Sequence, residues 1–203
     1  MKRENDKSAP KETLANWYPG HMAKALREIK KKLDFVDIVL EVRDARAPLV
    51  TANPALSEGL ESKCRLILLN KVNLCDPSMA KAWGKWLEEK GEAHLFVNSL
   101  DKGSMSKVIP RAREIVEANR LRCNPDYVAK NEKIKVMIVG LPNTGKSTII
   151  NMLAGKSVTK VADKPGETKM QQWIQIGEDI ELMDTPGVMP HKIVKPEHGL
   201  WLS

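Results

Sequence analysis

Residues 134–150 read IKVMIVGLPNTGKSTII, and this stretch decides the fold. It begins with Ile134–Val139, an apolar run rich in Val and Ile, which is typical of a buried strand. Gly140–Ser147 follows and matches the phosphate-binding pattern G-x-x-x-x-G-K-[ST]. Lys146–Leu153 then has a helical pattern. Because the pattern lies between a strand and a helix, it indicates the phosphate loop of a P-loop NTPase rather than an ordinary turn.

The residue types of this loop suit phosphate chemistry. Gly140 and Gly145 allow backbone torsions that a side chain would forbid, so the N–H groups of the loop can point at phosphate oxygens. Lys146 supplies a cation for the β- and γ-phosphates, and the Ser147 hydroxyl can bind Mg²⁺. The predicted nucleotide-binding residues of the loop are Asn143, Thr144, Gly145, Lys146, Ser147 and Thr148.

The same succession of strand and helix recurs along the chain. The expected strands are Val36–Val42, Arg65–Leu69, His94–Val97, Ile134–Val139, Gln172–Ile176 and Asp179–Met183. The expected helices are Met22–Leu33, Ser78–Glu89, Ser104–Asn119 and Lys146–Leu153. This alternation predicts an α/β fold with a mainly parallel six-stranded sheet and helices on both faces. Only Gly177-Glu178 separates the last two runs, which indicates an antiparallel hairpin at one edge.

The composition excludes several classes of protein. The 203 residues are 42% hydrophobic and 29% charged, as in an ordinary globular domain. The 3 cysteines show no C-x-x-C spacing, which disfavours a zinc site or a disulfide scaffold. No apolar run is long enough for membrane insertion, and residues 1–15 lack the apolar core of a secretory signal, so we expect a cytoplasmic protein with a polar, disordered leader. The formal charge of +7 suits a polyanionic partner.

A second motif, Asp184-Thr-Pro-Gly187, contains an acidic residue and follows the expected strand Asp179–Met183. An Asp at the carboxyl end of a neighbouring strand lies beside the phosphate loop, where it can bind Mg²⁺, and Gly187 can offer its N–H to a γ-phosphate. An ordinary turn is the alternative, since Asp-x-Pro-Gly is also favourable turn sequence. The preceding loop Lys164–Lys169 contains Pro and Gly and is a predicted switch segment, in which Thr168 completes the coordination of Mg²⁺.

A GTPase also needs a loop that reads guanine, usually Asn-Lys-x-Asp, and too few residues follow Asp184 to form one. Upstream, Asn70-Lys71-Val72-Asn73 stands at the end of the expected strand Arg65–Leu69. Asn98-Ser99 comes after the next strand and suits the loop that backs the base. We therefore expect Asn70, Lys71, Val72, Asn73, Asn98 and Ser99 to bind the base of GTP. The base loops precede the phosphate loop, so the order of the motifs is circularly permuted.

Together these motifs resemble the ribosome biogenesis GTPase A (YlqF-type) family. The agreeing residues are Trp17–Met22 (WYPGHM), Asp44-Ala-Arg46, Asn70-Lys71, Asn98-Ser99, the phosphate loop, Pro165-Gly166, Thr168, Gln171-Gln-Trp173 and Asp184-Thr-Pro-Gly187. The resemblance covers about residues 16–190. It implies a GTPase that converts GTP to GDP and assists assembly of the large ribosomal subunit, whose RNA it contacts. It also implies Mg²⁺, and K⁺ bound through Asn143, and we expect a monomer.

The resemblance sets the expected domain boundaries. Residues 16–203 form the GTPase domain, with a base-binding half at 35–119 and a phosphate-binding half at 134–190. The connector 120–133 joins the ends that an unpermuted chain would have. The family carries a C-terminal helical domain that helps to grip ribosomal RNA. Residues 191–203 reach only into the helix after Asp184, so we interpret the sequence as either a truncated product or a minimal form.

One position departs from the guanine-reading pattern. Asn73 stands where a GTPase usually has Asp, whose carboxylate accepts two hydrogen bonds from guanine. An amide offers one acceptor and a donor, and the loss of a charge-assisted pair costs on the order of 1.5–3 kcal/mol. We therefore expect weakened guanine specificity, unless Asp76 or a backbone group substitutes for the missing carboxylate.

Two further positions bear on catalysis. Many GTPases place a water-orienting Gln directly after Asp-x-x-Gly, where this chain has Val188, so we expect slow hydrolysis without the ribosome. The chemistry then depends on Lys146, on Thr168 and on the bound cations. His21 can supply the missing polar group, and a helix-capping or RNA-facing histidine is the alternative.

Basic residues gather on two expected helices, at Lys24, Arg27, Lys30, Lys31 and Lys32 and at Arg111, Arg113, Arg120 and Arg122. In a chain that resembles a ribosome assembly factor, such faces suit RNA phosphates, and a solvated helix face is the alternative. Two other functions stay open. One is a nucleotide-binding RNA module with little hydrolysis. The other is a metabolic P-loop phosphotransferase, which needs an acceptor site and lid arginines that the sequence does not offer.

Overall fold

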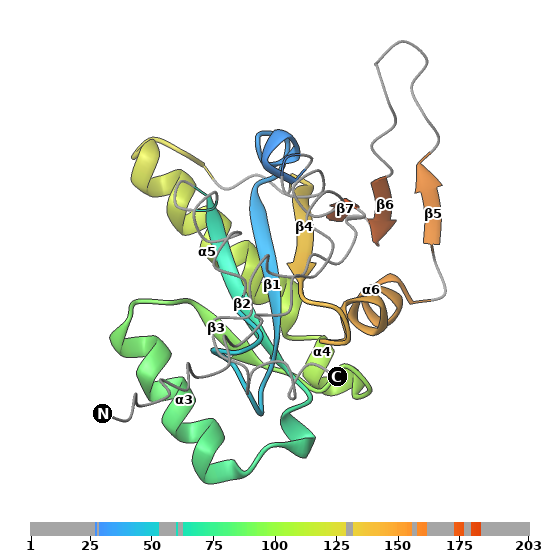
Figure 1. Ribbon diagram of the computed structural model, residues 1–203. Helices are drawn as coiled ribbons and strands as arrows, with labels where there is room; N and C mark the ends of the chain where they lie inside the picture. Colours follow the sequence, from blue (N-terminus) through green and yellow to red (C-terminus); the bar gives the residue numbers. More distant parts are fainter. Residues whose placement is uncertain are drawn as a thin grey trace, which may run out of the picture.

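A computed structural model describes Arg27, Leu60 and residues 29–52, 63–128, 132–155, 158–161, 173–176 and 180–183. Its centre is a seven-stranded sheet in the order β3-β2-β1-β4-β7-β6-β5, which runs from left to right in Figure 1. The strands are β1 (Ile38–Asp44), β2 (Cys64–Asn70), β3 (His94–Phe96), β4 (Ile134–Gly140), β5 (Val158–Val161), β6 (Trp173–Ile176) and β7 (Ile180–Met183).

The mainly parallel sheet predicted from the sequence is confirmed. Strands β3, β2, β1, β4 and β7 pair in parallel, while β7, β6 and β5 pair antiparallel, so the expected hairpin at one edge is present. All the expected strands form, and β5 is an additional edge strand that the search for apolar runs missed. Its sequence, V-T-K-V, has two polar residues between two valines, so it forms no continuous apolar run of the kind that predicts a buried strand.

The described helices are η1 (Val72–Leu74), α3 (Pro77–Glu89), α4 (Lys102–Met105), α5 (Val108–Cys123) and α6 (Lys146–Ala154), and residues 29–33 are helical as well. The prediction of one helix over Ser104–Asn119 is wrong, because α4 ends before α5 begins. Pro110 explains the break. It lacks an N–H group and fits only in the first turn of a helix, so α5 starts just before it.

Helices cover both faces of the sheet, as predicted. On one face, Leu40 of β1 belongs to a buried cluster with residues of α5 and with Ile149 of α6. On the other face, the neighbouring residue Val39 packs with Ile29 and Leu33 of the helical segment 29–33. Leu87 of α3 lies in a third cluster, together with Ile67 and Leu69 of β2. Successive residues of a strand point to opposite faces, so a continuous apolar run such as β1 can serve both layers.

The segment expected to join the two halves of the chain is fastened to the sheet. Helix α5 continues through Cys123, so Arg120–Cys123 are helical instead of belonging to a connector. Arg120 donates from Nη2 to Asp37 Oδ1 over 3.1 Å and from Nη1 to the Tyr127 hydroxyl over 3.1 Å. Asp37 Oδ2 accepts from the N–H of Lys135 at 2.8 Å. These bonds tie the end of α5 to the amino ends of β1 and β4.

Candidate functional site

The loops expected to bind a nucleotide meet at one edge of the sheet. Strands β2, β1 and β4 are adjacent and parallel, so their carboxyl ends lie side by side. Asp44 at the end of β1 pairs in register with Asn70 at the end of β2, and Val42 pairs with Gly140 at the end of β4. Ligands of open α/β sheets bind at this edge.

At two positions of the phosphate loop, the backbone conformation and its close neighbours allow only glycine. Gly140 has φ of 151°, and a Cβ there would collide with the carbonyl oxygen of Val42. Gly145 has φ of 98° and precedes α6, and a Cβ there would collide with the side-chain amide of Asn70. Both glycines of the predicted motif are therefore required, because neighbouring residues approach them too closely for a side chain. For Gly145 this neighbour is Asn70, a residue of the base loop.

The side chains of the phosphate loop hold it in a folded arrangement. Lys146 donates from Nζ to the carbonyl oxygen of Leu141 over 2.6 Å, and the Thr144 hydroxyl donates to the same carbonyl over 2.9 Å. Burial lowers the pKa of Lys146, because it disfavours the charged ammonium. Ser147 is exposed in the first turn of α6, where its hydroxyl is open to a ligand. The Leu141 carbonyl thus holds both Lys146 and Thr144 within the folded loop.

Asn70 connects the base loop to both of its neighbours. Its side chain is fully buried and donates from Nδ2 to the carbonyl oxygen of Thr144 over 2.9 Å. Its Oδ1 accepts from the N–H of Ser99 at 3.0 Å. The residue predicted to begin the base-reading motif therefore joins the phosphate loop to the loop after β3.

Of the other predicted base-loop residues, Lys71, Val72 and Asn98 make hydrogen bonds within the chain, whereas Asn73 is exposed. Lys71 has φ of 62° and donates from Nζ to the Asn143 carbonyl oxygen over 2.8 Å. Val72 donates its N–H to the carbonyl oxygen of Val97 over 3.2 Å and packs into the cluster that contains Leu87. Asn98 accepts from the N–H of Leu100 at 3.1 Å through its side chain. Asn73, in η1, is exposed at this edge.

Asp76 is committed to a structural role. It is the N-cap of α3, and its Oδ1 accepts from the N–H of Ser78 at 2.8 Å and from the N–H of Met79 at 3.2 Å. Hydrogen bonds from the Ser78 hydroxyl and from these two N–H groups lower the pKa of Asp76. An aspartate with these partners is a helix cap, which argues against Asp76 as the group that replaces the missing guanine-reading carboxylate.

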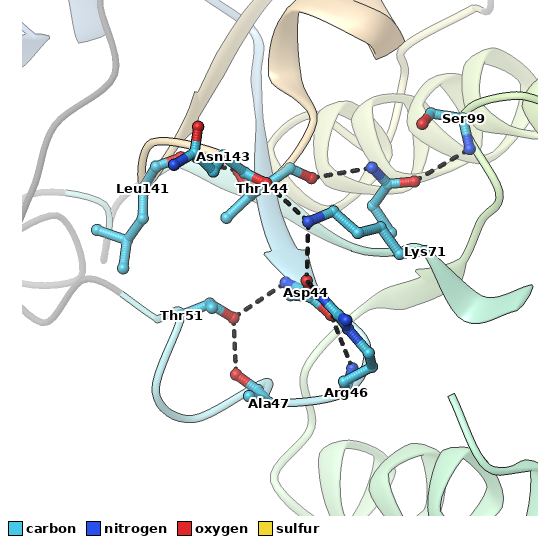
Figure 2. A network of polar contacts seen from close by, with 10 residues as sticks. Asp44, Arg46, Ala47, Thr51, Lys71, Ser99, Leu141, Asn143 and Thr144 are labelled. Carbon is cyan, nitrogen blue, oxygen red and sulfur yellow. Dashed lines mark hydrogen bonds and ion pairs between the residues drawn. The ribbon is translucent and has the colours of Figure 1, made fainter. Parts of the chain in front are cut away.

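Sequence reasoning gave no role to Asp44 and Arg46, although both belong to a motif of the resemblance. Asp44 Oδ2 lies 3.0 Å from Nζ of Lys71, and Figure 2 shows the carboxylate among the residues of the base and phosphate loops. Besides the resemblance, the signal in the sequence was position, because an acidic residue at the carboxyl end of a central strand lies at the ligand-binding edge.

Several predicted site residues lie outside the described residues. They are His21, Thr168, Asp184, Gly187 and Val188, so their predicted roles stay predictions. Within the parts of the chain that are described, no group of three or more His, Cys, Asp or Glu side chains is gathered as a metal site. The Ser147 hydroxyl, beside a folded phosphate loop, is a donor of the kind that Mg²⁺ accepts in nucleotide sites. None of the described helices is long and apolar enough to span a bilayer.

The arginines of α5 are occupied by partners within the chain. Arg111 pairs with Glu114 at 2.8 Å, and Arg122 donates to the side chain of Asn119 over 2.8 Å. Arg113 donates to the carbonyl oxygen of Glu132 over 3.1 Å. Arg113 and Arg120 thus fasten α5 to neighbouring segments, whereas the exposed Arg111 and Arg122 have their partners within α5, so a role of this second basic cluster in RNA binding stays a prediction.

These features define a P-loop nucleotide-binding domain of the GTPase kind, in which the base loop precedes the phosphate loop. A family model described as 50S ribosome-binding GTPase matches residues 135–200. The ribosome biogenesis GTPase A of Bacillus pumilus is 42% identical over 92% of this chain and 66% of its own length. The protein of the same name from Bacillus licheniformis is 41% identical, over 94% of this chain and 67% of its own length.

Solved structures agree with these relatives. The crystal structure of GNP-bound YlqF from T. maritima matches with a TM-score of 0.62 and 32% identity, over 86% of this chain and 62% of that chain. A mitochondrial ribosome-associated GTPase 1 from Mus musculus is 37% identical over 94% of this chain and 60% of its own length. The chain belongs to the ribosome biogenesis GTPase A family, which confirms the resemblance seen in the motifs. It spans about two thirds of the length of the bacterial relatives, at 66% and 67%.

Proposed function

We propose that this chain binds GTP and GDP and hydrolyses GTP as an assembly factor for the large ribosomal subunit. One observation carries the proposal: Asn70 of the base loop is bonded to Thr144 of the phosphate loop and to Ser99 of the loop after β3. These contacts support the proposal because they bring the loop expected to bind the base and the loop expected to bind the phosphates together at one sheet edge. A phosphotransferase would need an acceptor site as well, and the family relationship favours the GTPase.

The residues of this chain divide the work between binding and charge stabilisation. The N–H groups at the start of α6 and the Lys146 ammonium face the phosphates, once Lys146 exchanges the Leu141 carbonyl for a phosphate oxygen. Ser147, Thr168 and Asp184 are the proposed ligands of Mg²⁺, and Gly187 offers its N–H to the γ-phosphate. When bound, Mg²⁺ neutralises charge that develops on the phosphate oxygens. His21 is the proposed candidate for the polar group that orients water.

K⁺ is proposed as a second cation, at Asn143. This residue has φ of 62° and is exposed at the turn of the phosphate loop. Its backbone carbonyl accepts from Lys71 at 2.8 Å, which leaves the side-chain amide oxygen to bind a monovalent cation. A cation there adds positive charge next to the phosphates, where hydrolysis develops negative charge.

The proposed partner is the large ribosomal subunit and its RNA. The match to a 50S ribosome-binding GTPase model and the names of the relatives support this partner. The formal charge of +7 and the exposed Lys30 and Lys31 suit a polyanion. We propose that GTP favours docking on the subunit and hydrolysis favours release, by a monomeric protein in the cytoplasm. Ordering of the loops that contain Thr168 and Gly187 would be the switch.

The test measures GTP hydrolysis with and without large ribosomal subunits, in K⁺ and in Na⁺. We expect slow hydrolysis by the protein alone, because Val188 cannot orient water, and acceleration by the subunit that is greater in K⁺. Lys146→Ala should abolish nucleotide binding, whereas Lys81→Ala, at an exposed position of α3, should behave as the wild type.

Two results would count against this proposal. Absence of stimulation by the subunit in either salt would contradict an assembly GTPase. Tight binding of nucleotide and RNA without any hydrolysis would favour a nucleotide-binding RNA module instead.

A further inference from the structure

The turn that begins with Asp44-Ala-Arg46 is part of the ligand-binding edge, yet nothing described so far uses it. Asp44 is the last residue of β1, between the strands that carry the base loop and the phosphate loop. The residue is 6% exposed, so its carboxylate is a buried charge at the junction of the two loops. A buried carboxylate is costly unless its oxygens are paired, and its partners therefore indicate what it holds in place.

Arg46 fixes the orientation of this carboxylate. Its Nε and backbone N–H both donate to Oδ1 over 3.0 Å, and its Nη2 donates to Oδ2 over 2.8 Å. Burial alone would raise the pKa of Asp44, but the hydrogen bonds from Arg46 and Lys71 outweigh it and lower that pKa to about 2. The carboxylate stays charged, and its planar fork with Arg46 leaves one direction for a further cation.

Lys71 occupies that direction and links the turn to the phosphate loop. Its ammonium lies 3.0 Å from Asp44 Oδ2 and donates to the Asn143 carbonyl oxygen over 2.8 Å. Figure 2 shows this ammonium between Asp44 on one side and the segment of Asn143 on the other. The side chain of a base-loop residue is therefore held at its tip by residues that follow two different strands.

The turn itself is fastened, so it can serve as a fixed support. The Thr51 hydroxyl accepts from the N–H of Asp44 at 3.0 Å and donates to the Ala47 carbonyl oxygen over 2.7 Å. The N–H of Ala45 donates to the Asn70 carbonyl oxygen over 2.8 Å, and the thiol of Cys75 donates to the Ala45 carbonyl oxygen over 3.3 Å. The turn thus contacts the base loop at two points besides the Asp44–Lys71 pair.

We propose that Asp44, oriented by Arg46, is a positioning residue that holds Lys71 against the phosphate loop and presets the base pocket before nucleotide arrives. The inference rests on the proposed function, since it assumes that the base of GTP lies along Lys71. A lysine side chain loses much rotamer freedom when it is ordered, and a preset side chain removes that cost from ligand binding. Asp44 acts on the base side of the site, so it should affect GDP and GTP equally.

The first experiment replaces Asp44 by asparagine, which keeps the shape and removes the charge. We expect GDP and a non-hydrolysable GTP analogue each to bind about tenfold more weakly, as for the loss of a hydrogen bond between charged groups. The KM for GTP should rise while kcat changes much less. Arg46→Ala, at a residue whose side chain is 48% exposed, should give a smaller loss of affinity in the same direction without disturbing the core.

A double-mutant cycle separates positioning from a general loss of structure. If Asp44 acts through Lys71, then the Asp44→Asn, Lys71→Ala double variant should bind GDP no more weakly than Lys71→Ala alone. Asp126→Asn, at an exposed position after α5, is the matched control and should bind as the wild type. Thermal unfolding of each variant reports whether it folds, and the Arg46→Ala measurement stands if Asp44→Asn does not fold.

Three outcomes decide the matter. Unchanged GDP affinity in both the Asp44 and the Arg46 variants would overturn the inference, and so would effects of Asp44→Asn and Lys71→Ala that simply add. A loss confined to the GTP analogue would overturn it as well, because it would place Asp44 on the γ-phosphate side. If the wild type bound no guanine nucleotide, the proposed function itself would fail, and the wild-type titration alone, before any variant is compared, would show that.

Discussion

At the scale of single residues, Asn73 is the position that we expect to decide which purine the base loop selects. It is exposed in η1, just after Lys71, whose side chain is tied to the phosphate loop. Asp76 caps α3 through its Oδ1, which argues against it as the carboxylate that would read guanine. An amide presents one acceptor for the purine N1–H and a donor, which suits the 2-oxo group of xanthine better than the 2-amino group of guanine.

This chemistry predicts weak discrimination between GTP and XTP. Competition against labelled GTP should show XTP displacing it about as well as GTP does, and Asn73→Asp should restore a preference for GTP of about tenfold or more. Lys81→Ala, on the exposed face of α3, should leave the ratio unchanged. Strong exclusion of XTP by the wild type would show that another group reads the base.

At the scale of elements, β1 carries a network of charges inside the protein. Glu41 is 1% exposed and accepts from Arg43 Nε at 2.8 Å and from Arg43 Nη2 at 3.0 Å. Arg65 of β2 lies 3.4 Å from the same carboxylate and pairs in turn with Glu92. Glu41 and Arg43 lie on one face of β1, between the cluster with Ile29 and the cluster with Leu87. The network neutralises its own charges, and it has no contact with the nucleotide loops among those described.

Glu41→Gln should therefore lower stability strongly. It leaves the Arg43 guanidinium buried without its countercharge, and breaking a buried pair in this way costs about 3–5 kcal/mol. The free energy of unfolding in urea measures this loss. The matched control is Glu114→Gln, which breaks an exposed pair with Arg111 and should cost under about 0.5 kcal/mol. Equal losses in the two variants would contradict a structural role for the buried network.

The elements also indicate what can be predicted from sequence and what cannot. The phosphate loop was predicted in full because its strand, glycines and helix are local, and the structure has them at β4 and α6. The role of Asp44 was not predicted, because it depends on Lys71 and Asn143. These residues are distant in the sequence and come together only in the folded chain. Strand β5 is not predicted, because it lacks a continuous apolar run. The break between α4 and α5 is not predicted from the helical pattern either, although Pro110 favours a helix start there.

At the scale of the whole molecule, one sheet holds the base half and the phosphate half together. Strand β1 pairs with β2 of the base half on one side and with β4 of the phosphate half on the other. Bonds from Asp37 to Arg120 and to Lys135 fasten the opposite edge, and the Asn70 and Lys71 contacts fasten the nucleotide edge. A permuted chain order is compatible with an intact site because these contacts do not depend on where the chain begins.

The distribution of charge over the molecule predicts which face meets a polyanion. Arg113 and Arg120 of α5 are bound to residues outside that helix, and Arg122 donates to Asn119 within it, whereas Lys30 and Lys31, beside the buried Ile29, are exposed on the opposite face of the sheet. If these lysines contact two RNA phosphates, Lys30→Glu with Lys31→Glu should weaken binding to large ribosomal subunits and reduce the slope of log K against log salt by about 2. Arg122→Glu, on α5, should change that slope much less. A slope that falls for Arg122→Glu and stays unchanged for the lysine variant would place the RNA against α5 instead.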